Sequence, residues 1–298
     1  MALTAEYIPP TPTPTPTIPS ASMGRSWGTA LLAVVAIELI ALYAPTARWL
    51  YGRWTMSVWH NAHGLFIPPL VAWMIWQELK ARPDLPASSS PWGFAFLVPA
   101  LALQVLDTGM HTDLLSAMAL VLALPGLSLL FLGVARTRLI AFPLFLAIFA
   151  LPIPLGMTET IHLVLRKVAI AGASAVLPLL GITVFSEGTT LHTVRGSLEV
   201  ADACSGFSTL YAAMAVAFLT AYTAATTARR ALVLLLAAPI AIASNVLRVI
   251  ILVGLVVWQG QPILETFVHP LSGMMTFALS LPIIFWLGGP PAQRTTAP

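Results

Sequence analysis

The sequence carries little charge: 14 Lys and Arg and 11 Asp and Glu make up 8% of 298 residues. A soluble globular domain carries about 25% charged residues, so this chain cannot cover a water-facing surface. Hydrophobic types reach 58%, which predicts an all-α polytopic helical bundle surrounded by the lipid bilayer. The net charge of +3 is too small to indicate a nucleic-acid partner, and we expect none.

Cysteine is also scarce: the sequence has one, Cys204, so no disulfide can form within the chain. A lone cysteine is usually a small apolar residue of a core. Cys204, however, follows the acids Glu199 and Asp202 and precedes a Ser205-Gly206 pair that opens a predicted helix. Free backbone N–H groups at a helix start favour the thiolate. From this segment alone, a nucleophile and a small boundary residue remain equally good readings.

Proline is concentrated near the N-terminus, where Pro and Thr alternate from Pro10 to Pro16. This composition is typical of an extended, disordered spacer. The apolar run that follows, Trp27–Ala44, lacks a small-residue cleavage site, so we expect an anchor rather than a cleaved signal peptide. The predicted organisation is a tail over residues 1–26, a membrane domain over 27–288 and a short tail over 289–298.

Eight apolar runs approach the roughly 20 residues that a membrane span needs. The second and third are short and must borrow flanking residues. The eight runs are Trp27–Ala44, His63–Glu78, Trp92–Leu106, Leu114–Val134, Leu139–Leu155, Ser205–Ala224, Ala231–Trp258 and Leu271–Leu287.

A ninth segment, Ile161–Leu180, carries His162 and Arg166 four residues apart, opposite an apolar side. That pattern fits an amphipathic helix in the membrane interface. If this segment does not span, the pair Arg229 and Arg230 falls on the cytoplasmic side together with both termini, as the positive-inside tendency favours. The outer face then carries Cys204, the outer half of the seventh span and the start of the eighth.

Arg248 is the strongest polar signal, because it lies deep in the apolar run Ala231–Trp258. A guanidinium within a span costs at least about 2.5–3.5 kcal/mol, so it indicates a functional site by default. Asn245 is its one strongly polar neighbour, one turn away on the same helix face. The alternative is a structural ion pair with Glu38 of the first span.

His269 comes just before the last span and is of the residue type best suited to exchange protons at neutral pH. The three residues make a coherent mechanism. The thiolate of Cys204 attacks a carbonyl, His269 moves the proton and Arg248 stabilises the oxyanion. Asn245, Ser205 and Gly206 are expected to support this site.

The pair His60 and His63 has a spacing that a metal site can use, but no third ligand accompanies it. We expect the two histidines to face substrate at the outer mouth, with no metal and no cofactor in the protein. The sequence shows no phosphate-binding glycine loop, no Gly-x-Ser-x-Gly elbow and no two-histidine zinc motif.

An ordered set of short motifs resembles the exosortase/archaeosortase family, from about Trp59 to Leu287. The ordered set is more specific than any one motif. Its pieces are His60–Gly64 running into Ile67-Pro68-Pro69-Leu70, then Phe142–Phe145 with Leu151–Pro154, Ala203-Cys204-Ser205-Gly206-Phe207, Asn245-Val246-Leu247-Arg248, and His269 with Gly273.

The resemblance implies a multispanning cysteine peptidase or transpeptidase of the bacterial inner membrane, active at the periplasmic face. Its partners would be exported proteins that end in a sorting signal: a short motif such as Pro-Glu-Pro, a transmembrane helix and a basic tail. Cys204, Arg248 and His269 fall on the family's proposed catalytic positions. Two alternatives remain open, a component of a polysaccharide polymerase or flippase and a transporter in which Cys204 is incidental.

Overall fold

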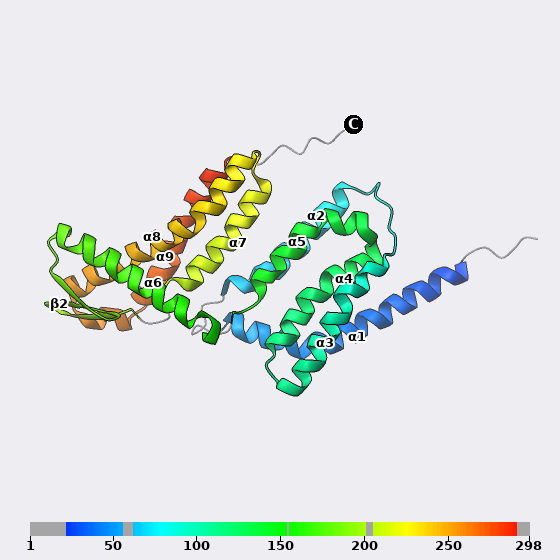
Figure 1. Ribbon diagram of the computed structural model, residues 1–298, viewed down its shortest axis with the longest axis horizontal. Coiled ribbons are helices and arrows are strands. Elements are labelled where there is room, and N and C mark those ends of the chain that lie inside the picture. Colours follow the sequence, from blue (N-terminus) through cyan, green and yellow to red (C-terminus); the bar gives the residue numbers. More distant parts are fainter. Residues whose placement is uncertain (1–21, 56–61, 154, 201–204, 291–298) are drawn as a thin grey trace, which may run out of the picture. The chain divides into compact units, whose positions relative to one another are not determined.

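The computed structural model describes residues 22–55, 62–153, 155–200 and 205–290. Within these ranges the chain is mostly helical (Figure 1), which confirms the expected all-α class. The α-helices are α1 (Ser22–Thr55), α2 (Ile67–Ala81), α3 (Phe94–Met110), α4 (Leu114–Leu139), α5 (Ala141–Leu146), α6 (Leu155–Val176), α7 (Phe207–Thr223), α8 (Thr227–Gln259) and α9 (Val268–Gly288). Short 3₁₀ helices are η2 (Ala62–Leu65), η3 (Pro91–Gly93), η4 (Ala147–Ala150), η5 (Leu177–Leu180) and η7 (Gln261–Glu265).

The chain divides into two compact units, residues 1–45 and 46–298. The boundary falls at Pro45, inside α1. All described residues of the predicted site belong to the second unit. The expected Pro/Thr tail lies mostly outside the described residues.

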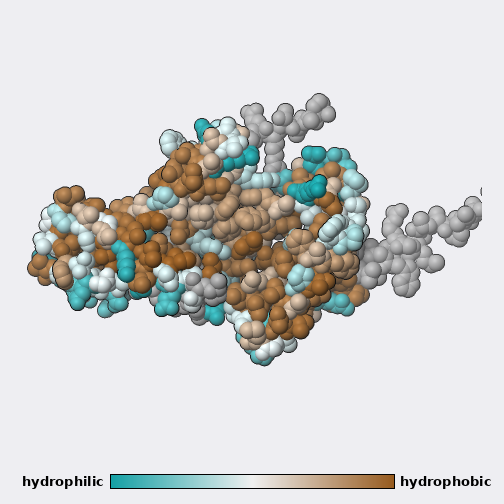
Figure 2. Space-filling model, viewed as in Figure 1, coloured by the Kyte–Doolittle hydropathy of each residue, from teal (hydrophilic) through white to brown (hydrophobic). Residues whose placement is uncertain are grey.

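Six helices in the described part of the chain, α1, α3, α4, α6, α8 and α9, contain stretches long and apolar enough to cross a membrane. Two shorter apolar helices cover Ala141–Ala150 and Phe207–Thr223. Large hydrophobic side chains such as Trp73 and Leu235 are exposed. Figure 2 shows hydrophobic residues over much of the visible surface. The protein is therefore a multi-pass helical membrane protein.

The expected fifth span, Leu139–Leu155, is shorter than predicted. Leu139 belongs to α4, which continues past a break at Gly133, where φ is +77° and ψ 176°. The apolar helix then covers only Ala141–Ala150. It ends at Leu151, whose backbone is extended, because the residue before a proline disfavours the helical conformation.

Helix α6 contains most of the segment that the sequence places in the membrane interface. His162 is buried, whereas Ile161, Val164 and Val168 on its other sides are exposed. His162 thus faces the protein together with the apolar residues Leu165 and Ala169, while other apolar side chains of the helix face outward. Thr158–Leu180 also has the length and hydropathy of a span, so the interfacial position stays a prediction.

A three-stranded antiparallel sheet follows α6, and the sequence analysis did not predict it. The strands β1 (Val184–Glu187), β2 (Thr190–Thr193) and β3 (Gly196–Glu199) pair in the order β1-β2-β3. Glu187 pairs with Thr190 and Thr193 with Gly196, so two-residue loops join the strands, as is typical of hairpins. The missed signal is the cluster of β-branched residues around Gly188 and Gly196.

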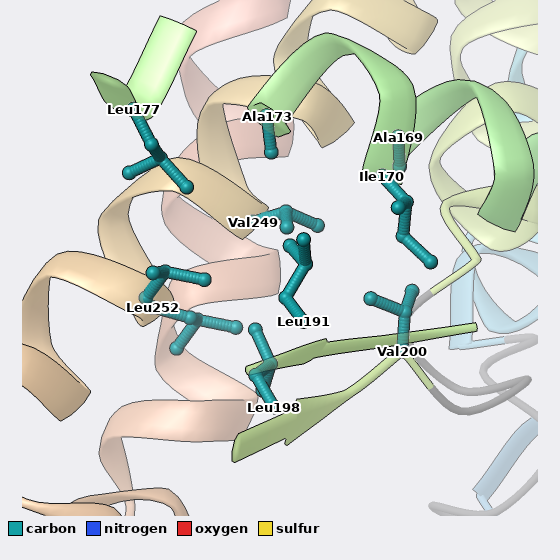
Figure 3. Close-up of a cluster of buried hydrophobic side chains, with 10 residues drawn as sticks. Ala169, Ile170, Ala173, Leu177, Leu191, Leu198, Val200, Val249 and Leu252 are labelled. Atoms are coloured by element: carbon teal, nitrogen blue, oxygen red, sulfur yellow. The ribbon is translucent and has the colours of Figure 1, made fainter. Parts of the chain in front are cut away.

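The sheet packs its apolar side onto α6 and α8. Leu191 and Leu198 point into one buried cluster with Ala173 of α6 and Leu252 of α8 (Figure 3). Val200 extends the ladder through a hydrogen bond from its N–H to the carbonyl of Thr189, 2.9 Å long. The chain is therefore held firmly up to a point four residues before Cys204.

Helices α7, α8 and α9 pack against one another through small residues. Ala213 and Ala217 of α7 and Ala237 and Ala241 of α8 form a buried cluster with Ile284 of α9. Small side chains let helices approach closely. In lipid, where the hydrophobic effect does not drive helices together, such close packing is a main source of helix association. This close packing brings the polar residues of the three helices within hydrogen-bond reach.

Candidate active site

Helix α7 begins at Phe207, three residues after Cys204, with Ser205 and Gly206 between them. Ser205 is 1% exposed, and its Oγ accepts a hydrogen bond from the N–H of Phe207, 3.3 Å long. Gly206 is the N-cap with φ of +84°, a left-handed conformation that glycine adopts without a Cβ penalty. The Ser-Gly pair thus leads the chain into the helix, and its supporting role in the site stays a prediction.

Asn245 of α8 holds the backbone of this turn. Its Nδ2 donates a hydrogen bond to the carbonyl of Ser205, 2.9 Å long and fully buried. The two residues are 40 positions apart in sequence, so this bond is what ties α7 to α8 at the helix start. A Cβ on Gly206 would overlap the Asn245 side chain, which explains why the shortest residue occupies that position.

Arg248 lies one turn further along α8 and is 5% exposed. Its Nε donates to Oγ of Ser272 on α9, 3.0 Å away. A Cβ on Gly273 would lie 3.1 Å from Arg248 Cζ, so the guanidinium rests directly on the first turns of α9. A buried cation is costly unless it is hydrogen-bonded, and here α9 supplies both a hydroxyl acceptor and the space.

His162 of α6 is the residue that the sequence analysis did not include in the site. Its Nδ1 lies 2.7 Å from Ser205 Oγ, with His162 8% and Ser205 1% exposed. Its ring centroid is 4.8 Å from that of Phe207. The signal in the sequence was the polar pair His162 and Arg166 four residues apart, which the sequence analysis interpreted as the polar side of an interfacial helix.

Two of the predicted residues, Cys204 and His60, lie outside the described residues. His269 belongs to the first turn of α9, and its side chain is outside the description. Ser272 and Gly273 follow it by three and four positions, which places them on the same helix face. In the described part of the chain, Asn245 thus contacts the residue after Cys204, and Arg248 contacts the helix turn that follows His269.

His63 packs beside α7 rather than in a ligand cluster. Its ring meets Tyr211 edge-on at 5.0 Å between centroids, and Tyr211 in turn stacks with Phe207 at 6.2 Å. Burial lowers the pKa of His63 to about 4. Among the described residues, no three His, Cys, Asp or Glu side chains come together as metal ligands would.

The helices and this buried polar cluster define a polytopic membrane protein with a polar site enclosed by α6, α7, α8 and α9. Residues 54–286 match the sequence model of a protein family described as transmembrane exosortase. The chain belongs to that family. Comparison with curated proteins gives no significant match, and comparison with solved structures gives none.

Proposed function

We propose that the protein is a cysteine peptidase or transpeptidase that cleaves exported proteins at their C-terminal sorting signals. Cys204 is the nucleophile, His269 the general base and acid, and Arg248 the oxyanion donor. One observation supports this assignment most. The buried Arg248 is bound to Ser272 on the helix that carries His269, while its neighbour Asn245 is bound to Ser205, the residue after Cys204.

In the first half of the reaction, the sulfur of Cys204 attacks the scissile carbonyl and its proton passes to His269. The tetrahedral intermediate collapses when the C–N bond breaks, and His269 returns the proton to the leaving amine. The product is a thioester between Cys204 and the substrate protein. A second amine resolves the thioester by transpeptidation, or water resolves it by hydrolysis, with His269 accepting the nucleophile's proton.

Arg248 acts through a fixed positive charge close to the developing oxyanion. A guanidinium stays protonated in proteins and presents its N–H donors in a rigid fork. In a site enclosed by helices, preorganised donors of this kind are worth far more than in water. The bond from Nε to Ser272 and the close approach of Gly273 fix the orientation of that fork.

The substrate class is proposed from family membership together with the multi-pass fold. A sorting signal that contains its own transmembrane helix would reach such an enzyme from within the bilayer. We place the enzyme in the bacterial inner membrane with its site at the periplasmic face, and cleavage just before the substrate's helix.

The test is processing of a tagged, co-expressed protein that ends in a short motif, an apolar helix and a basic tail. Cys204→Ala and Cys204→Ser should leave the substrate uncut while the variants accumulate in the membrane at normal levels. Arg248→Lys keeps the positive charge but loses the planar arrangement of N–H donors, so it should slow cleavage strongly. Complete processing by Cys204→Ala would exclude the proposal and favour a polymerase, flippase or transporter.

A further inference from the structure

Ser205 is held at two of its atoms by two different helices. Asn245 of α8 binds its carbonyl oxygen at 2.9 Å, and His162 of α6 binds its hydroxyl at 2.7 Å. Ser205 follows Cys204 directly in the chain, so any rotation of its backbone redirects the cysteine. Asn245 belongs to the set of predicted motifs, whereas His162 does not.

The hydrogen bonds around the Ser205 hydroxyl are mutually consistent when His162 is neutral. Oγ accepts from the N–H of Phe207 at 3.3 Å, which leaves its own hydrogen free to donate. An unprotonated Nδ1 of His162 then accepts that hydrogen at 2.7 Å. A hydroxyl that both accepts and donates is fixed in rotation, so the side chain of Ser205 has one orientation.

We infer that His162 is a positioning residue for the nucleophile: it fixes Ser205 and through it the direction in which Cys204 presents its sulfur. The inference rests on the proposed function, because it needs Cys204 to be the reacting group. Misplacing a reacting atom by about 1 Å can cost about 100-fold in rate. A hydrogen bond that fixes the hydroxyl of the neighbouring residue, Ser205, limits such displacement.

The packing of α6 gives little reason for this histidine on structural grounds alone. Ala169, Ile170 and Ala173 already anchor α6 to α8 and the sheet in a buried cluster (Figure 3). Burying a polar pair only to hold two helices together gains little, since each group first loses its hydration. The pair is better explained by what it fixes, which is the residue beside Cys204.

The test compares four variants: His162→Phe, His162→Asn, Ser205→Ala and the double variant His162→Phe with Ser205→Ala. Phenylalanine keeps the ring against Phe207 but removes the acceptor, whereas asparagine keeps a hydrogen-bonding atom at the place of Nδ1. The readouts are kcat and KM for cleavage of a purified substrate in detergent. A second readout is the rate at which N-ethylmaleimide alkylates Cys204, the one cysteine in the chain.

We expect His162→Phe and Ser205→Ala each to lower kcat by about tenfold or more, equivalent to about 1.4 kcal/mol, with KM nearly unchanged. His162→Asn should recover most of the loss. The double variant should be no slower than the slower single variant, because both changes break the same contact between His162 and Ser205. The alkylation rate of Cys204 should change in the same variants that lose kcat.

Wild-type kcat in His162→Phe or in Ser205→Ala would overturn the inference, as would a double variant whose losses multiply. If His162→Phe does not fold, Ser205→Ala carries the test, since it removes one oxygen. The two proposals fail separately. Processing by Cys204→Ala removes the proposed function, whereas an inactive Cys204→Ala with a fully active His162→Phe removes only the role of His162.

Discussion

Arg248 and Ser272 are joined across two helices by a buried hydrogen bond of 3.0 Å from Nε to Oγ. Ser272 follows His269 by three positions, so the bond links the intramembrane cation to the helix turn that carries the predicted base. Gly273 completes the contact by leaving room for the guanidinium.

Gly273→Ala should disturb Arg248. The added Cβ would lie 3.1 Å from Cζ and 3.2 Å from Nη2 of Arg248, so the guanidinium must move by a few tenths of an ångström. Overpacking of this kind typically costs about 1–3 kcal/mol, and we expect substrate cleavage to fall by about tenfold or more. The measurement is the initial rate of cleavage in detergent.

The matched control is Gly254→Ala in α8, where nothing lies within 4 Å of the added Cβ. An alanine there removes the backbone freedom of a helical glycine and should stabilise the protein by about 0.5–1 kcal/mol without changing the rate. Equal rates for the two variants would show that the space at Gly273 does not matter for Arg248.

Gly206→Ala should lower stability and activity by more than the strain of its left-handed backbone alone would. Its φ of +84° costs an alanine about 1–2 kcal/mol, and the added Cβ would also overlap Asn245. Gly181 isolates the first effect, because its φ is +76° and nothing lies within 4 Å of its Cβ. Gly181→Ala should lower the melting temperature slightly and keep activity, whereas Gly206→Ala should lose both. Similar behaviour of the two variants would contradict a specific contact between Gly206 and Asn245.

Asn245→Asp should reduce cleavage more than Asn245→Ala. A carboxylate cannot donate to the Ser205 carbonyl, and its charge one turn from Arg248 competes with Ser272 for the guanidinium. Losing a buried hydrogen-bond partner costs about 1–3 kcal/mol, so Asn245→Ala should slow cleavage by about five- to 150-fold and Asn245→Asp by more. Rates measured at equal enzyme concentration decide this. A faster Asn245→Asp than Asn245→Ala would mean that charge competition is unimportant.

The sequence was sufficient to predict the helical membrane fold, because most predicted apolar runs each overlap one long helix, the fifth run being the exception. It also singled out Asn245 and Arg248, because a polar pair deep in an apolar run is costly without a purpose. It placed Ser205 and Gly206 at a helix start, where Gly206 is the N-cap of α7. These inferences needed only local composition and helix periodicity.

Contacts between distant segments were not predictable in the same way. His162 meets Ser205 across 43 positions, and its helical pattern fits either a headgroup-facing or a protein-facing side. The sheet at Val184–Glu199 was missed because its strands are four residues each, too short for a clear alternation. The assignment of these elements depends on what packs against them, which one sequence does not state.

The stability of the protein should depend on pH through His63. Although the second predicted apolar run begins at His63, in the structure this residue lies in η2, before α2 and outside the six stretches long enough to cross a membrane. Burial lowers its pKa from the usual 6.5 to about 4. Between these values the unfolded chain binds more protons than the folded one, so stability rises with pH. The contribution is present above pH 6.5 and is lost as pH falls through 4, and it is on the order of 3 kcal/mol.

Thermal denaturation in detergent from pH 4 to 7.5 measures this effect. The control is His63→Phe, which keeps an aromatic ring against Tyr211 but cannot titrate. The difference in melting temperature between wild type and His63→Phe should change most between pH 6.5 and 4. A difference that stays constant across this range would show that His63 titrates alike in the folded and unfolded chain.

The most direct test of the central claim is detection of the covalent intermediate. The purified enzyme is mixed with substrate, quenched in acid within seconds and analysed by mass spectrometry. We expect a substrate fragment attached as a thioester to the peptide that contains Cys204, removable by hydroxylamine and strongly reduced in Arg248→Lys. Cleaved substrate without any adduct on Cys204, or the same cleavage by Cys204→Ala, would contradict the account.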